Sequence, residues 1–245
     1  MANLLNVCRR GAIAVACLIS FHANAGVVIA ATRVIFPAEQ TEVTVKLSNR
    51  GVSPFLVRAW IDDGRPEVPL EQLRVPFRLM PPLFRLEVGK SQSLRIFHTG
   101  DGMPPDRESL YWLNVLEVPP KEQGNALQFS LRSRIKLFYR PHGLPGSSAD
   151  AYQSLTWKMA REGGGWGVVA TNPGPYHINL AKLDVHVGQQ VISLNPSYIS
   201  PFSSKRFVLE KVPRVSAGEL HFSTIDDYGA VRDGLSTADS APGRG

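Results

Sequence analysis

The residues that most often carry catalysis are not arranged in catalytic patterns in this sequence. The histidines show no HExxH motif or other paired metal-ligand spacing, and no G-x-S-x-G motif marks an activated serine. Both cysteines, Cys8 and Cys17, lie in the first 25 residues, which we expect to be removed. The glycines at 163–165 precede a strand-like segment, so they favour a hairpin turn over a phosphate-binding loop. We therefore expect no enzyme activity, no metal and no cofactor.

The chemistry that remains is the binding of an anion by cations in apolar surroundings. Arg33 precedes the apolar run 34–36, and Lys136 lies between Ile135 and Leu137. A buried cation without a partner is costly, so each needs an anion or access to water. The residues alone leave open whether the two cations bind a partner or simply face solvent from a strand.

An alternating segment, residues 125–134, precedes Lys136. Strict alternation places Leu127, Phe129 and Leu131 on one face of a strand. The opposite face carries Gln128, Ser130 and Arg132. Pattern alone favours a half-buried strand of the protein's own sandwich.

The elements that must position these residues are strands. Apolar alternation, β-branched and aromatic residues and regularly spaced turn residues indicate an all-β chain at the spacing of a β-sandwich, with no helical period. Residues 141–148 are rich in proline and glycine and predict a linker between two domains, 26–141 and 142–232. Residues 233–245 are apolar-poor and predict a flexible tail. The expected strands cover residues 41–48, 54–61, 77–86, 91–97, 108–118, 126–139, 155–160, 166–171, 177–187, 205–209 and 219–225.

The first 25 residues predict a signal peptide. Arg9 and Arg10 precede an uncharged, mostly apolar run at 11–21, and residues 22–25 end in an Ala-x-Ala cleavage site before Gly26. The full chain has 27 basic and 21 acidic residues. Without Arg9 and Arg10 the net charge is 25 − 21 = +4, which is too small to indicate a nucleic-acid-binding protein. No apolar run reaches the ~20 residues of a membrane helix, so we expect export without membrane insertion.

Residues 103–120 resemble the signature of periplasmic pilus-assembly chaperones, the PapD/FimC-like family. The resemblance rests on Asp106, Glu108, Asn114 and Pro119 within this segment. Further similar pieces follow the family's order at 32–36, 135–141, 172–173 and 225–229. The resemblance implies two immunoglobulin-like β-sandwich domains in a boomerang arrangement. It also implies a periplasmic chaperone that binds, stabilises and caps pilus or fimbrial subunits and delivers them to an outer-membrane usher.

The resemblance also implies roles for particular residues. Arg33 and Lys136 would grip the subunit's C-terminal carboxylate in the interdomain cleft. The donor strand, lent to a subunit that lacks its own last strand, would present the apolar side chains of Leu127, Phe129 and Leu131. An ionic link between the domains would consist of Glu108, Arg140 and Asp227. Because surface ion pairs contribute little to stability, we expect this link to fix the interdomain angle and to have a structural role, not a binding one.

Two further expectations concern partners. An unpaired apolar edge is an aggregation hazard, so the free protein is expected to cover it by self-association. The alternative to a chaperone is a secreted two-domain immunoglobulin-like adhesion or binding module, such as an adhesin or a fimbrial subunit.

Overall fold

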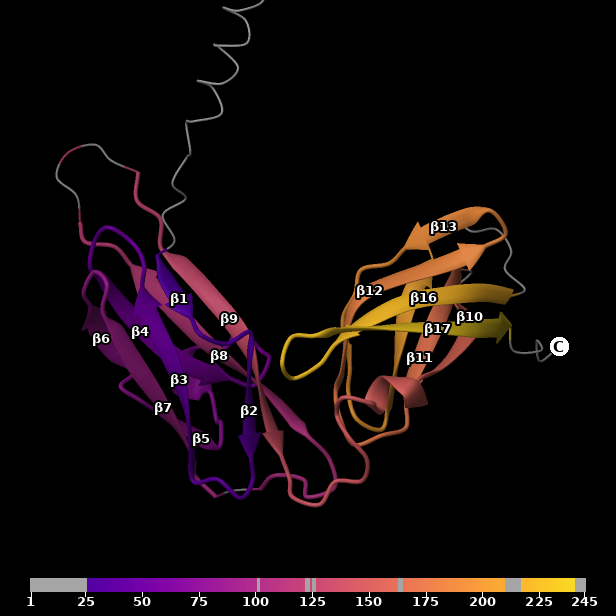
Figure 1. The fold of residues 1–245 in the computed structure, drawn as a ribbon, viewed down its shortest axis with the longest axis horizontal. Helices are drawn as coiled ribbons and strands as arrows, with labels where there is room; N and C mark the ends of the chain where they lie inside the picture. Colours follow the sequence, from indigo (N-terminus) through magenta and orange to yellow (C-terminus); the bar gives the residue numbers. More distant parts are fainter. Residues whose placement is uncertain are drawn as a thin grey trace, which may run out of the picture.

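The computed structural model describes residues 26–100, 102–121, 124, 127–162, 165–209 and 217–240. In this part of the chain the only helices are two short 3-10 turns, η1 (Leu70–Gln72) and η2 (Ala151–Ser154). Strands β1–β9 form one body, and β10–β17 form a second body set at an angle to it (Figure 1). The predicted all-β fold of two domains in a boomerang arrangement is confirmed. The expected signal peptide, residues 1–25, lies outside the described residues.

The first domain is a sandwich of two sheets, with strand orders β1-β3-β7-β5 and β2-β9-β8-β4-β6. Alternation explains how it packs: along β3, Val45 and Leu47 are buried while Thr44 and Lys46 face solvent. The strands are β1 (Val27–Ile29), β2 (Arg33–Pro37), β3 (Glu42–Asn49), β4 (Phe55–Asp62), β5 (Phe77–Met80), β6 (Leu83–Leu86), β7 (Ser91–His98), β8 (Ser109–Val118) and β9 (Leu131–Arg140).

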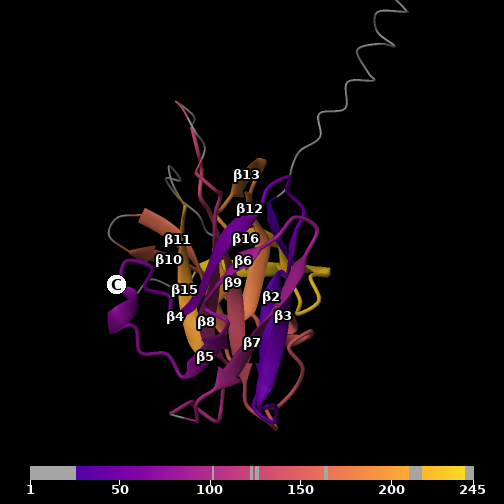
Figure 2. The same ribbon diagram turned by 90° about the vertical axis from the view of Figure 1, so that its left-hand side faces the viewer.

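Strand β9 is paired along only half of one side. Strand β8 pairs with β9 from Leu131 to Tyr139, but the parallel strand β2 begins at the pair Arg33↔Lys136 and continues to Pro37↔Arg140. The preceding strand, β1, pairs with β3 in the opposite sheet. Residues 131–135 therefore have no strand partner on the β2 side among the described residues. Residues 127–130, just before them, extend beyond the end of the sandwich (Figures 1 and 2).

The second domain has the strand order β13-β12-β16-β17-β10-β11-β15, with β14 paired to β12. Its core lies between the β12–β16 side and the β10–β11–β15 side, where the Trp157 and Phe222 rings are 5.2 Å apart. Figure 1 shows the β16–β17 turn pointing toward the first domain. The strands are β10 (Thr156–Glu162), β11 (Gly165–Asn172), β12 (Ile178–Val187), β13 (Gln190–Ser193), β14 (Tyr198–Ile199), β15 (Ser203–Leu209), β16 (Ala217–Ile225) and β17 (Val231–Ser240).

The structure corrects the prediction of a tail at 233–245. Strand β17 runs to Ser240 and pairs with β16 from Val231 to Asp239, whereas residues 241–245 lie outside the described residues. Small residues hide this strand from sequence reading: Ala238 is fully buried, and a Cβ at Gly234 would collide with the Phe222 ring. Strand β17 is therefore held by backbone pairing with β16 and by the close approach of its small residues to the core, because it has few large apolar side chains.

Two expected strands also differ from the observed ones. The segment 77–86 is two strands, because Pro81 and Pro82 lie between β5 and β6 and cannot donate to a sheet. The segment 126–139 is a strand only from Leu131, where pairing with β8 begins. Residues 125 and 126 lie outside the described residues.

Strand β17 gives a first prediction. A chain that stops after Ala230 loses all pairing to β16 and the cover over Phe222, and at a net ~1 kcal/mol per hydrogen bond this costs several kcal/mol. We expect the second domain to unfold at much lower urea, as measured by tryptophan fluorescence. A chain that stops after Ser240 is the control and should match the full chain. Equal urea midpoints for both truncations would show that 231–240 is a tail.

Candidate functional site

Arg33 and Lys136 are brought together by the parallel pairing of β2 and β9, where they are register partners. Both reach the second domain: Arg33 Nη1 donates to the carbonyl of Ile225 at 2.9 Å, and the Lys136 ammonium donates to Asn179 Oδ1. The same ammonium lies 4.9 Å from the centre of the Tyr198 ring. The two cations thus occupy the space between the domains.

Neither of these cations has an anionic partner in the part of the chain that the structure describes. Among the described residues, no carboxylate forms an ion pair with Arg33 or Lys136, and the Arg33 Nε is buried without a hydrogen-bond acceptor. Burial, together with the charges of Arg33 and Lys205, lowers the pKa of Lys136 to about 8. Burial also lowers the pKa of Arg33, with partial compensation from Asp227 and Asp226. The cleft therefore presents unpaired positive charge that a carboxylate could neutralise.

Three second-domain residues of this cleft were not predicted from the sequence. Asn179 and Tyr198 contact Lys136. The ammonium of Lys205 lies 5.2 Å from the centre of the same Tyr198 ring. They come from β12, β14 and β15, which are far apart in the chain, and none stands in a motif. No sequence signal could have joined them to Arg33 and Lys136.

The expected donor face is exposed. Leu127, Phe129 and Leu131 have exposed fractions of 82%, 76% and 59%. In β9 the odd-numbered positions Leu137 and Tyr139 belong to the core of the sandwich. Because side chains alternate, the exposed leucines and phenylalanine continue that core-facing row beyond the end of the sandwich. Among the described residues, an exposed apolar row therefore lies beside a backbone edge that pairs with no strand.

Side chains on the opposite face of β9 contact neighbouring strands of the same sheet. Arg132 donates to Asn114 Oδ1 at 2.7 Å and lies 4.9 Å from the Trp60 ring centre. Arg134 donates to the buried carboxylate of Asp62 at 2.6 Å. These contacts keep the strand extended and leave only its apolar row free for a partner.

The predicted ionic link forms, but not at the surface. Arg140 Nη2 is 2.7 Å from Glu108 and 2.8 Å from Asp227, so one guanidinium joins carboxylates of both domains. Glu108 is buried and also accepts the backbone N–H of His177 at 2.8 Å. Ser148 of the linker donates to Asp227 at 2.7 Å. Because Glu108 is buried, removing Arg140 would leave a buried charge uncompensated, so we expect this link to contribute more to stability than an exposed ion pair does.

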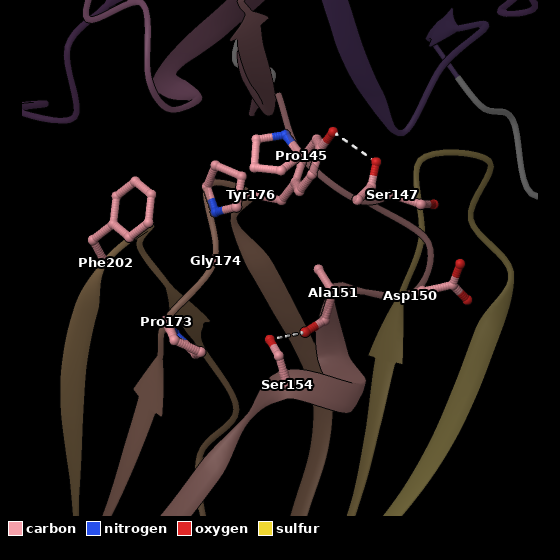
Figure 3. Close-up of a pocket in the computed structure, with 11 residues that line it drawn as sticks. Pro145, Ser147, Asp150, Ala151, Ser154, Pro173, Gly174, Tyr176 and Phe202 are labelled. Carbon is pink, nitrogen blue, oxygen red and sulfur yellow. Dashed lines mark hydrogen bonds between the residues drawn. The ribbon is translucent and has the colours of Figure 1, made fainter. Parts of the chain in front are cut away.

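A separate hollow of about 460 Å³ lies on the second-domain side of the linker (Figure 3). Its walls include Pro145, Ala151 and Pro173, and Ser154 donates to Ala151 at its floor (Figure 3). Tyr176 donates to the carbonyls of linker residues 144 and 146, both at 3.3 Å. The described residues that line the hollow include neither Arg33 nor Lys136, so the hollow lies apart from these cations, beside the linker.

The described residues contain no cluster of three or more histidine, cysteine or acidic side chains suited to a metal ion. They also contain no helix long and apolar enough to cross a membrane. The chemistry available at the site is anion binding and strand addition.

The fold and the site together are two β-domains with the cations Arg33 and Lys136 between them and a half-paired strand, β9, whose exposed apolar row leads toward that pair. Residues 26–145 match the model of the pili and flagellar-assembly chaperone PapD N-terminal domain, and residues 150–236 match that of the pili assembly chaperone PapD C-terminal domain. The chain belongs to the PapD-like pilus-assembly chaperone family.

Individual relatives agree with this assignment. The chaperone protein FimB/FhaD of Bordetella pertussis is 46% identical over 217 residues, which cover 85% of this chain and 86% of the relative. The chaperone protein HifB of Haemophilus influenzae is 40% identical over 231 residues, covering 91% and 92%.

Solved structures show the same fold. The crystal structure of the YadV chaperone superposes with a TM-score of 0.76 at 34% identity and covers 87% of this chain and 100% of that one. A chain from the Salmonella enterica SafA pilin in complex with the SafB chaperone gives a TM-score of 0.71 at 31% identity, covering 89% and 98%.

The buried ionic link gives a second prediction. Replacing Arg140 by Met leaves Glu108 and Asp227 without their shared cation, so we expect a loss of about 3–5 kcal/mol in the free energy of unfolding. Arg85→Met is the control, because Arg85 forms an exposed pair with Glu87 and should cost only ~0–1 kcal/mol. Urea denaturation measures both. A similar small loss in the two variants would contradict a buried link.

Proposed function

We propose that this chain is a periplasmic, non-catalytic chaperone that binds, stabilises and caps fimbrial subunits by donating a strand, and then delivers them to an outer-membrane usher. The observation that carries the proposal is the half-paired strand β9, whose free edge and apolar row lead directly to the pair Arg33 and Lys136. The signal-peptide pattern of residues 1–25 supports periplasmic location.

In this proposal the two cations act first. The subunit's C-terminal carboxylate binds between Arg33 and Lys136, which otherwise lack an anion. This contact fixes the register, because every later residue of the subunit strand is counted from the bound carboxylate. The subunit strand then pairs with the free edge of β9.

The apolar row supplies most of the favourable free energy. Burying Leu127, Phe129 and Leu131 contributes roughly 1.5–3 kcal/mol each, and backbone pairing adds a net ~1 kcal/mol per hydrogen bond. Association entropy and ordering of the subunit offset a large part of this gain. The result is binding that is tight and still transferable to an usher.

When no subunit is bound, the exposed side chains of Leu127, Phe129 and Leu131 need another partner to shield them from water. A second copy of the chain, pairing edge to edge, would bury those three side chains until a subunit arrives. The remaining alternative, a secreted immunoglobulin-like adhesion or binding module, would not require cations unpaired beside a donor edge.

The cation pair gives a third prediction. Arg33→Ala or Lys136→Ala should leave the fold unchanged by circular dichroism but reduce subunit recovered from periplasm by more than ten-fold. Because the pKa of Lys136 is about 8, carboxylate binding by the unaltered chain should weaken as pH rises above about 8 and the ammonium loses its proton. Arg161→Ala, at an exposed position of β10, is the control. Normal recovery with both cleft variants would refute the carboxylate role.

The phase of the donor strand gives a fourth prediction. Leu131→Glu would place an unpaired charge in the subunit's groove, which costs several kcal/mol, roughly enough to abolish recovery. Gln128→Glu changes the opposite face, where the exposed Gln128 donates to the carbonyl of Pro120, and should have little effect. Pull-down from periplasm, with circular dichroism for folding, measures both. Equal loss from the two substitutions would mean that the strand phase is wrong.

A further inference from the structure

The cleft contains a third cation that comes from the second domain. Lys205 lies on β15, and its ammonium donates to Ser197 Oγ at 2.6 Å. Among the described residues it forms no ion pair with a carboxylate. Its ammonium is 5.2 Å from the centre of the Tyr198 ring, and the ammonium of Lys136 is 4.9 Å from the same centre. One aromatic ring thus contacts a cation from each domain.

Placing like charges together in this way costs free energy unless an anion joins them. The π-face of tyrosine lowers that cost by attracting both ammonium groups, but it does not neutralise them. The positive charges of Arg33 and Lys205 both lower the pKa of Lys136, so both cations repel the charged form of Lys136. A bound carboxylate would offset this repulsion at Lys136.

We propose that Lys205 is a carboxylate-binding residue of the cleft, so that a subunit's C-terminus is held by cations of both domains. The inference rests on the proposed chaperone function and extends it from the pair Arg33 and Lys136 to a site that exists only when the domains have their observed angle. The ion pairs of Arg140 with Glu108 and Asp227 join the two domains in this arrangement.

The pH dependence of carboxylate binding by Lys136 depends on the charged and titratable groups around this side chain. Arg33 approaches from β2 and Lys205 from β15, while Trp112, Asn179 and Tyr198 are neutral neighbours. Asp226 and Asp227 act on Arg33, and His177 lies 6.0 Å from Tyr198, ring centre to ring centre. Removing the charge of Lys205 therefore removes one of two cationic neighbours that lower the pKa of Lys136.

The test uses a short, N-terminally labelled model peptide of alternating valine and threonine, made with a free C-terminal carboxylate and as its C-terminal amide. We expect the unaltered chain to prefer the acid over the amide by at least ten-fold in Kd. Lys205→Met should reduce this preference about ten-fold, the effect of losing one charge-assisted contact. Lys205→Arg should restore most of it. Lys158→Met removes an exposed charge from the same domain and should change nothing.

A second readout separates charge from packing. In Lys205→Met the pH at which acid-peptide binding weakens should move upward from about 8, because Lys136 keeps its proton longer. A merely structural role for Lys205 would alter affinity for acid and amide equally and leave this pH unchanged. Urea denaturation verifies that each variant is folded.

The outcomes distinguish the two proposals. If Arg33→Ala removes the acid preference while Lys205→Met retains it, the cleft binds a carboxylate without Lys205 and the inference is overturned. If the unaltered chain shows no acid preference and Arg33→Ala changes nothing, the carboxylate site of the proposed function is itself refuted, and Lys205 with it.

Discussion

The incomplete pairing of β9 is the constraint on which the rest of the structure depends. Strand β2 joins the sheet only from Arg33 onward, because the chain before it pairs with the opposite sheet. This single change of sheet has two consequences. It places Arg33 beside Lys136. It also leaves residues 131–135, which directly precede Lys136, without a strand partner on the β2 side among the described residues. A strand that continued pairing would satisfy the edge and remove the place for a partner.

The free edge is tolerable because the rest of the strand is held firmly. Arg132 and Arg134 fasten one face to Asn114, Asp62 and two tryptophan rings. The other face then has no freedom to turn inward, so its apolar side chains remain exposed in a fixed row. Exposing this apolar row to water costs free energy in the free protein, and burial against a partner would recover that free energy.

Electrostatics follows the same logic in the cleft. Arg140 forms ion pairs with two carboxylates, one from each domain, whereas Arg33 and Lys136 share a space with no carboxylate paired to them among the described residues. The first arrangement joins the two domains, and the second leaves positive charge where they meet. Cations of the same types therefore differ here in whether the fold supplies their counter-ions.

Much of this protein could be predicted from the sequence, because period-two alternation and turn residues act over short distances. They indicated two all-β domains, most strands and the phase that groups Leu127, Phe129 and Leu131. The local signals failed at β17, where Ala238 and Gly234 support a strand through close packing that composition does not reveal. Only the tertiary structure decided that β2 stops short of residues 131–135, that Glu108 is buried, and that Lys205 and Tyr198 meet Lys136. The physical reason is that burial and charge pairing depend on residues distant in the chain, which only the folded domains and their mutual angle bring into contact.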